Sequence, residues 1–145
     1  MKENNKNLNK YIYRLLIISF FIILVNSLES FIHAKSNELV QSFIKVNPGS
    51  TANDYLSVVL INYFMSIVEA VIITIFTVFT YKKYAITKLY KFIFGAIVLL
   101  RIFNTVIKFN FSSVFYFLNI TLYILLFILI ITAPITKRKV KNGLL

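Results

Sequence analysis

Residues 55–80 read YLSVVLINYFMSIVEAVIITIFTVFT, and residues 92–109 read FIFGAIVLLRIFNTVIKF. Both stretches are apolar and long enough to cross the hydrocarbon core of a bilayer, which takes roughly 20 helical residues. Each also carries one formal charge near its midpoint, Glu69 in the first and Arg101 in the second. The basic link at residues 81–91 predicts that the two stretches are antiparallel neighbouring helices in a membrane.

The two midpoint charges are expected at the same depth. Glu69 lies 11 residues from Thr80, and Arg101 lies 10 residues from Lys91, so each is about 15 Å from the link. An ionisable side chain at the bilayer centre costs about 2.5–3.5 kcal/mol. Pairing removes most of that cost, because arginine can hold a carboxylate through two hydrogen bonds. The sequence therefore predicts a buried ion pair between Glu69 and Arg101.

The role of this pair has several interpretations. It can be a structural lock between the two helices. Alternatively, Glu69 exchanges protons or binds a ligand, and Arg101 tunes its charge. A third possibility is that the two side chains do not meet, or that they pair between subunits.

The composition places the whole chain in a membrane. Of its 145 residues, 59% are hydrophobic and 14% are charged, which is not the balance of a soluble domain. Four apolar blocks predict spans at residues 12–32, 55–80, 92–109 and 114–135. The expected fold is all-α, a single transmembrane four-helix bundle with no separate soluble domain. No cysteine is present, so thiolate metal sites and disulfides are excluded.

Basic residues predict the orientation of the chain. Twelve of the 16 Lys and Arg residues fall on one side of the predicted spans, three fall on the other side, and Arg101 lies within a span. The positive-inside rule then places both termini in the cytoplasm. The basic clusters are expected to contact anionic lipid head groups, and no nucleic-acid binding is expected. The twelve are Lys2, Lys6, Lys10, Arg14, Lys82, Lys83, Lys88, Lys91, Lys137, Arg138, Lys139 and Lys141; the three are Lys35, Lys45 and Lys108.

Polar side chains gather in the outer half of the predicted bundle. In the fourth block, one face carries an asparagine between two tyrosines, Tyr116 and Tyr123. The inner half is expected to be mostly Ile, Leu and Phe. The outer residues either tie the helices together by hydrogen bonds or line a water-filled vestibule that is open outward and closed inward. They are Asn26, Glu29, Asn62, Asn104 and Asn119.

The outer loop at residues 35–53 contains its own pattern. Residues 37–46 predict a short amphipathic helix, and Thr51 with Asp54 predicts a capping box for the second span. Before the loop, Glu29 and His33 are four residues apart. They are a candidate pH-responsive or metal-binding pair. Two ligands are too few to predict a metal, so neither a metal nor another cofactor is expected.

In the order of these features along the chain, the protein resembles the PsiE family, small four-span bacterial membrane proteins named for induction by phosphate starvation. The chain departs from that family in the spacing of the acid and the histidine, in a longer outer loop, and in Ile86 and Thr87 where the family has a proline. The resemblance implies a stress-linked membrane protein with no established catalytic activity. The matching residues are Glu29, His33, Glu69, KLYKF at 88–92, Arg101, and KRK at 137–139.

Two functional hypotheses follow. The first is a non-enzymatic bacterial plasma-membrane protein of accessory, stress-response or immunity type, which acts through helix contacts with another membrane protein or a second copy of itself. The second is a small transporter or channel subunit with a midplane site at Glu69 and Arg101 and an outward-facing polar vestibule. An internal cavity would favour the second hypothesis.

Overall fold

The computed structural model describes residues 2–83, 86–107 and 113–135, and it is helical through almost all of them. The described residues form five α-helices: α1 (Lys2–Lys35), α2 (Asn37–Val46), α3 (Ala52–Lys83), α4 (Lys88–Ile107) and α5 (Val114–Ile131). The predicted all-α bundle with a short helix in its largest loop is confirmed.

Four of the helices are long and apolar enough to cross a membrane, over Leu8–Lys35, Ala52–Thr80, Lys88–Ile107 and Val114–Ile131. Helices α1 and α3 extend beyond the predicted spans at both ends. The fourth ends earlier than expected, at Ile131 rather than residue 135. Pro134 accounts for this difference, because a proline disfavours helical geometry in the residue before it. Residues 108–109 of the predicted third span lie outside the described residues.

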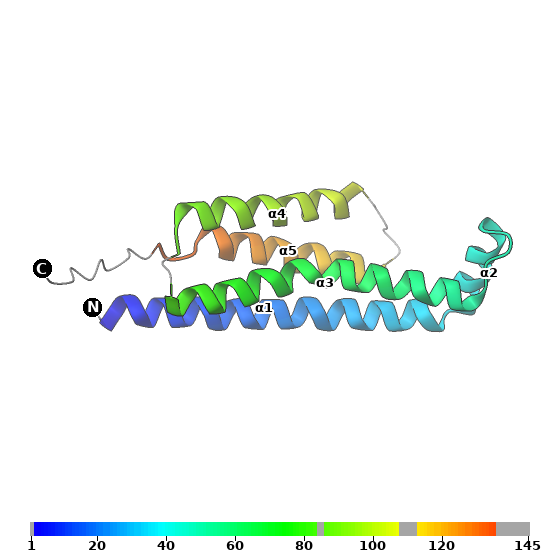
Figure 1. Cartoon of the computed structure of the whole chain (residues 1–145), viewed down its shortest axis with the longest axis horizontal. Helices are drawn as coiled ribbons and strands as arrows, with labels where there is room; N and C mark the ends of the chain where they lie inside the picture. The colour runs from blue at the N-terminus through cyan, green and yellow to red at the C-terminus, as the bar shows by residue number, and fades with distance from the viewer. Residues whose placement is uncertain (1, 84–85, 108–112, 136–145) are drawn as a thin grey trace, which may run out of the picture.

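The four long helices are antiparallel to their chain neighbours but do not all pack on one another. Figure 1 shows α1 and α3 side by side as a long pair, with the shorter α4 and α5 along one side of it. Close contacts join α1 to α3, α1 to α5, and α4 to α5, whereas α3 and α4 touch at few points. The order around the bundle is therefore α3, α1, α5, α4. Helices α3 and α4 are antiparallel, as predicted, but α4 packs mainly on α5 and meets α3 at few points.

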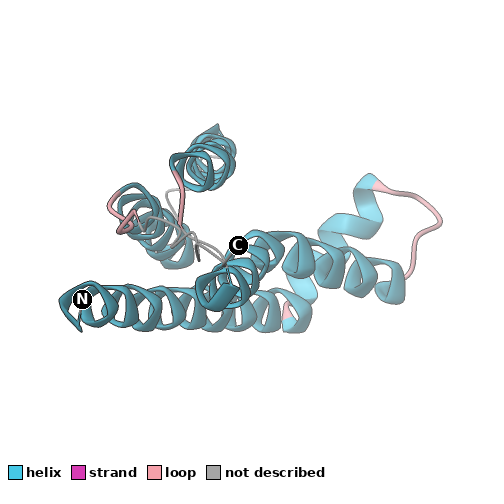
Figure 2. Ribbon diagram, turned by 60° about the vertical axis from the view of Figure 1, so that its left-hand side comes forward, coloured by secondary structure: helices cyan, strands magenta, loops and turns pink. Residues whose placement is uncertain are grey.

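Helix α2 caps one end of the bundle without joining its core. It has no buried residue, and its Phe43 ring lies 5.5 Å from the Tyr55 ring at the start of α3. Figure 2 shows α2 beside the end of α3, with the loop after α2 projecting beyond the long helices. That loop contains Gly49, whose φ of 94° is accessible to glycine at little steric cost.

The helix starts around this loop follow their sequence signals. The Ser36 hydroxyl accepts a hydrogen bond from the Leu39 N–H at 3.3 Å. Thr51 and Asp54 form the predicted reciprocal capping box: the Asp54 carboxylate accepts from the Thr51 N–H at 2.7 Å, and the Thr51 hydroxyl accepts from the Asp54 N–H at 3.3 Å. Such caps satisfy N–H groups that a helix start leaves without a partner.

Candidate functional site

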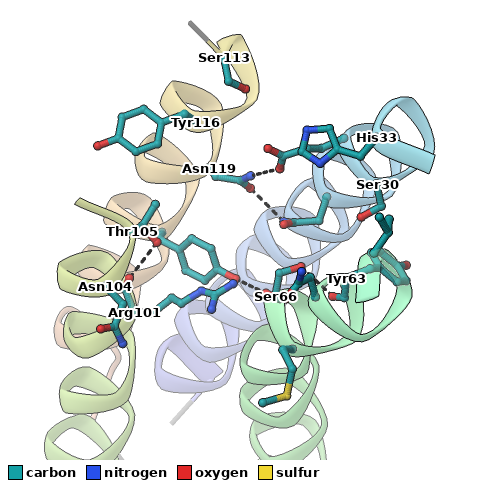
Figure 3. Close-up of a pocket in the computed structure, with 16 residues that line it drawn as sticks. Ser30, His33, Tyr63, Ser66, Arg101, Asn104, Thr105, Ser113, Tyr116 and Asn119 are labelled. Atoms are coloured by element: carbon teal, nitrogen blue, oxygen red, sulfur yellow. Dashed lines mark hydrogen bonds between the residues drawn. The ribbon is translucent and has the colours of Figure 1, made fainter. Parts of the chain in front are cut away.

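A polar cavity of about 370 Å³ lies among the four long helices, in the half of the bundle nearer α2 (Figure 3). All five residues predicted for the outer polar layer line it. The lining consists of Asn26, Glu29, Ser30 and His33 from α1; Val59, Asn62, Tyr63, Met65 and Ser66 from α3; Arg101, Asn104 and Thr105 from α4; and Ser113, Tyr116, Asn119 and Tyr123 from α5 and its N-cap.

One wall of the cavity is fixed by a hydrogen-bond network between α1 and α5. The side-chain amide of Asn26 donates to the Ile22 carbonyl at 2.7 Å and to the Asn119 amide oxygen at 2.9 Å. The Asn119 nitrogen in turn donates to Glu29 Oε2 at 3.0 Å. Both asparagines are buried, so these bonds offset the cost of removing two amides from water. They also hold the Glu29 carboxylate at the cavity wall.

The floor of the cavity is formed around Tyr123. This side chain is only 1% exposed, and its hydroxyl donates to the Ser66 carbonyl, which joins α5 to α3. The guanidinium of Arg101 lies over the Tyr123 ring, 5.6 Å from the ring centroid. This is within the range of a cation–π interaction, about 6 Å. The position of Arg101 is thus set by α5 as well as by α3.

Glu69 meets Arg101 just outside the cavity lining. The distance from Arg101 Nε to Glu69 Oε2 is 3.8 Å, and the side chains are 24% and 26% exposed, respectively. Both of these atoms are buried, and neither has a hydrogen-bond partner in the described structure. The two side chains thus meet in the ionic contact that the sequence predicts, but no hydrogen bond joins these two atoms. The sparse contact between α3 and α4 is consistent with this loose pairing.

The side of the cavity between α3 and α4 carries two side-chain amides without a hydrogen-bond partner in the described part of the chain. Asn62 and Asn104 are both exposed, and neither has a hydrogen-bond partner among the described residues. An amide without a partner is costly in hydrocarbon, whereas in water it loses little. These two amides are therefore suited to bind water or a polar solute.

Glu29 and His33 both line the cavity, at the end nearer α2. His33 is exposed, and its backbone carbonyl accepts a hydrogen bond from the Tyr55 hydroxyl at 3.1 Å. Figure 3 shows the imidazole on the α1 side of the cavity, the side that also carries Ser30. Among the described residues, no third His, Cys, Asp or Glu joins the pair to make a metal site.

Several lining residues are absent from the set predicted for the site. Tyr116 and Tyr123 share a helix face with Asn119, at spacings of three and four residues. This spacing is the sequence pattern that indicates that they line the cavity with Asn119. Tyr63 accepts a hydrogen bond from the Ser27 hydroxyl at 3.0 Å, which ties α3 to α1. No sequence pattern distinguishes Tyr63 from an ordinary interfacial aromatic residue.

Below the cavity, a layer of buried apolar side chains separates it from the other end of the bundle. Its members are less than 2% exposed: Ile22, Ala70, Ile73, Val98 and Leu126. The cavity is therefore closed toward the end of the bundle where α1 begins.

The inner half is nevertheless more polar than expected. The Ser19 and Thr74 hydroxyls are 2.6 Å apart. Tyr11 and Tyr90 are buried and hydrogen-bonded to each other at 3.0 Å. Tyr90 also bonds Thr77 at 2.5 Å. Helix packing turns these hydroxyls inward, where they hydrogen-bond one another between helices.

The chain was compared with models of protein families, with curated proteins and with solved structures, and none of them matches it. The resemblance to the PsiE family stays a prediction.

Proposed function

We propose that the protein is a small, non-enzymatic solute-binding membrane protein of the transporter or channel-subunit class. The observation that carries this proposal is the 370 Å³ polar cavity, which a layer of buried apolar side chains closes toward one end of the bundle. Its volume falls in the range of small-molecule sites, about 300–1,000 Å³. A protein whose polar residues only tie helices together has no need of such a space.

The unsatisfied amides support the same proposal. Asn62 and Asn104 gain no hydrogen bond within the described fold, yet they lie in helices apolar enough to cross a membrane. Polar groups in such positions usually mark a path or a site for polar molecules. Under the positive-inside rule, the proposed orientation in a bacterial plasma membrane has the closed end in the cytoplasm and the cavity in the outer half.

Cysteine labelling tests the position and the wetness of the cavity. The chain has no cysteine, so single substitutions report without background. Asn62→Cys lies in the cavity, and the adjacent Ile61→Cys replaces a side chain that is 61% exposed on the outside of the helix. A thiol reacts as its thiolate, which requires water.

A membrane-impermeant thiol reagent added outside cells should label Asn62→Cys and leave Ile61→Cys unlabelled. Equal protection of both cysteines would contradict a wet, outward-facing cavity. Labelling of Asn62→Cys only from the cytoplasmic side would reverse the proposed orientation.

Flux in liposomes then separates a carrier from a receptor. Proton or ion flux is measured for the parent protein, Glu69→Gln, Arg101→Gln and the double variant. Flux in the parent that is lost in Glu69→Gln, with the fold retained, would show that the ion pair takes part in transport. Binding without flux would assign the cavity to a receptor or a sensor.

A second candidate is an accessory protein of stress-response or immunity type that acts through helix contacts. The sparse contact between α3 and α4 favours it, because a helix of another membrane protein or of a second copy can pack there. Asn104→Cys would then be protected from the reagent in native membranes and reactive after purification. Equal reactivity in both states would argue against a resident partner.

A further inference from the structure

The polar cavity carries opposite charges on two of its walls. The Glu29 carboxylate projects from α1, and the Arg101 guanidinium projects from α4. Their anchors on α5 show that they lie at different depths: Asn119 donates to Glu29, and Tyr123 lies under Arg101. These anchors are four residues apart, which is about 6 Å along a helix.

Both charges retain capacity to bind a ligand. Glu29 accepts its described side-chain hydrogen bond through one oxygen only, Oε2. Arg101 makes no hydrogen bond to Glu69 from Nε, and the 3.8 Å separation leaves the ion pair loose. A guanidinium has five N–H donors, so it can hold a second anion without leaving Glu69.

We infer that the ligand of this cavity is a small zwitterion, with a primary ammonium at Glu29 and a carboxylate or phosphate at Arg101. The inference rests on the proposed solute-binding function and specifies its substrate class. A simple anion would be repelled by Glu29, and a simple cation would be repelled by Arg101. A neutral solute would leave Glu29 without a cationic partner and Arg101 with only its loose contact to Glu69.

The remaining polar groups fit the same ligand. Asn62 and Asn104 each offer one acceptor and two donors, so they can bond the ammonium or the anion. His33 also lines the cavity, exposed and one helical turn beyond Glu29 toward α2, so it does not lie between the two charges. Charge-assisted hydrogen bonds of about 2.8 Å at each end fit a ligand whose own charges are a few carbon atoms apart.

Two kinds of molecule carry both charges of such a ligand: a free amino acid and an aminoethyl phosphate lipid head group. The test separates them. Purified full-length protein in detergent is titrated calorimetrically with glycine, β-alanine, γ-aminobutyrate and O-phosphoethanolamine. Ethylamine and butyrate are the singly charged controls, and glycerol is the neutral control. In parallel, thermal unfolding is compared in nanodiscs of phosphatidylethanolamine and of phosphatidylglycerol.

At least one of the zwitterions should bind, and the singly charged and neutral probes should bind roughly tenfold more weakly or worse, because each lacks one charge-assisted bond. Glu29→Gln and Arg101→Gln should each weaken zwitterion binding by a similar factor. Glu38→Gln on α2 and Arg14→Gln near the closed end, both exposed and outside the cavity, are the matched controls. Stabilisation only in phosphatidylethanolamine nanodiscs would identify the head group as the source.

Equal binding of butyrate, ethylamine or glycerol would overturn the inference. A second outcome would also overturn it: a neutral solute protects Asn62→Cys from labelling, and none of the zwitterions does. That outcome would leave the solute-binding function intact. Absence of labelling at Asn62→Cys would overturn both the zwitterion inference and the proposed solute-binding function. If a charge variant does not fold, the comparison of zwitterionic and singly charged probes on the parent protein decides by itself.

Discussion

Glu69 Oε2 and Arg101 Nε lie 3.8 Å apart, in ionic contact but without a hydrogen bond between them. Both atoms are buried, although the side chains remain about a quarter exposed. The pair therefore lacks the hydrogen bonds that usually compensate buried charges. Removing one partner leaves the other charge in a poorly solvated place.

A double-mutant cycle tests whether these two residues stabilise each other. Glu69→Ala and Arg101→Ala should each lower the free energy of unfolding by about 1–3 kcal/mol. The double change should cost less than either single change, because it leaves no stranded charge. The free energies can be measured by SDS titration of the purified protein in mixed micelles. Independent, additive losses would show that the contact is energetically irrelevant.

The Asn119 network should stabilise the packing of α1 against α5. Asn119→Ala removes its bonds to Asn26 and Glu29, and bonds of this kind in membrane bundles are worth about 0.6 kcal/mol each, with a maximum near 1.7. We expect a loss of about 1–3 kcal/mol in the same unfolding assay. Thr121→Ala is the matched control, because its exposed hydroxyl bonds only the Phe117 carbonyl of its own helix. An equally large loss of unfolding free energy in Thr121→Ala would show that the hydrogen-bond network is not the cause.

The hydroxyl chain at the closed end has a defined direction. Thr77 donates to the Ile73 carbonyl at 2.6 Å, and a hydroxyl has only one proton to donate. Tyr90 must therefore donate to Thr77, and Tyr11 must donate to Tyr90.

Tyr90→Phe should break this chain and strand the Tyr11 proton, at a cost of about 1–3 kcal/mol. Tyr11→Phe should cost less, since it leaves Tyr90 bonded to Thr77. Tyr13→Phe, at a position that is 67% exposed, should have little effect. Thermal unfolding of the three variants checks this order, and equal effects of Tyr90→Phe and Tyr11→Phe would refute the assigned direction.

Helix α2 should be separable from the bundle. Phe43 contacts Tyr55 through its ring, and α2 has no buried residue. Phe43→Ala should therefore speed hydrogen exchange within α2 by roughly tenfold, the effect of about 1.4 kcal/mol, and leave α5 unchanged. Val46→Ala, at a position that is 79% exposed, is the control. Faster exchange throughout the bundle would mean that α2 supports the global fold.

The sequence by itself determined the helices and several of their ends. Length and apolar composition decide whether a segment spans a membrane, and capping depends on residues only three positions apart, as for Thr51 and Asp54. Residue counting also placed Glu69 and Arg101 at one level, because the rise of a helix is constant. All of these are properties of one segment or of two segments joined by a short link.

Only the tertiary structure decided which helices touch. Helix α4 packs on α5 and not closely on α3, which turns the expected bidentate pair into a loose contact and opens the cavity beside Asn62 and Asn104. It also turned Tyr90 inward toward Tyr11. Which helices are neighbours depends on how their apolar faces fit together. In a membrane, the faces that contact lipid and the faces that contact other helices are both apolar, so the sequence does not distinguish them.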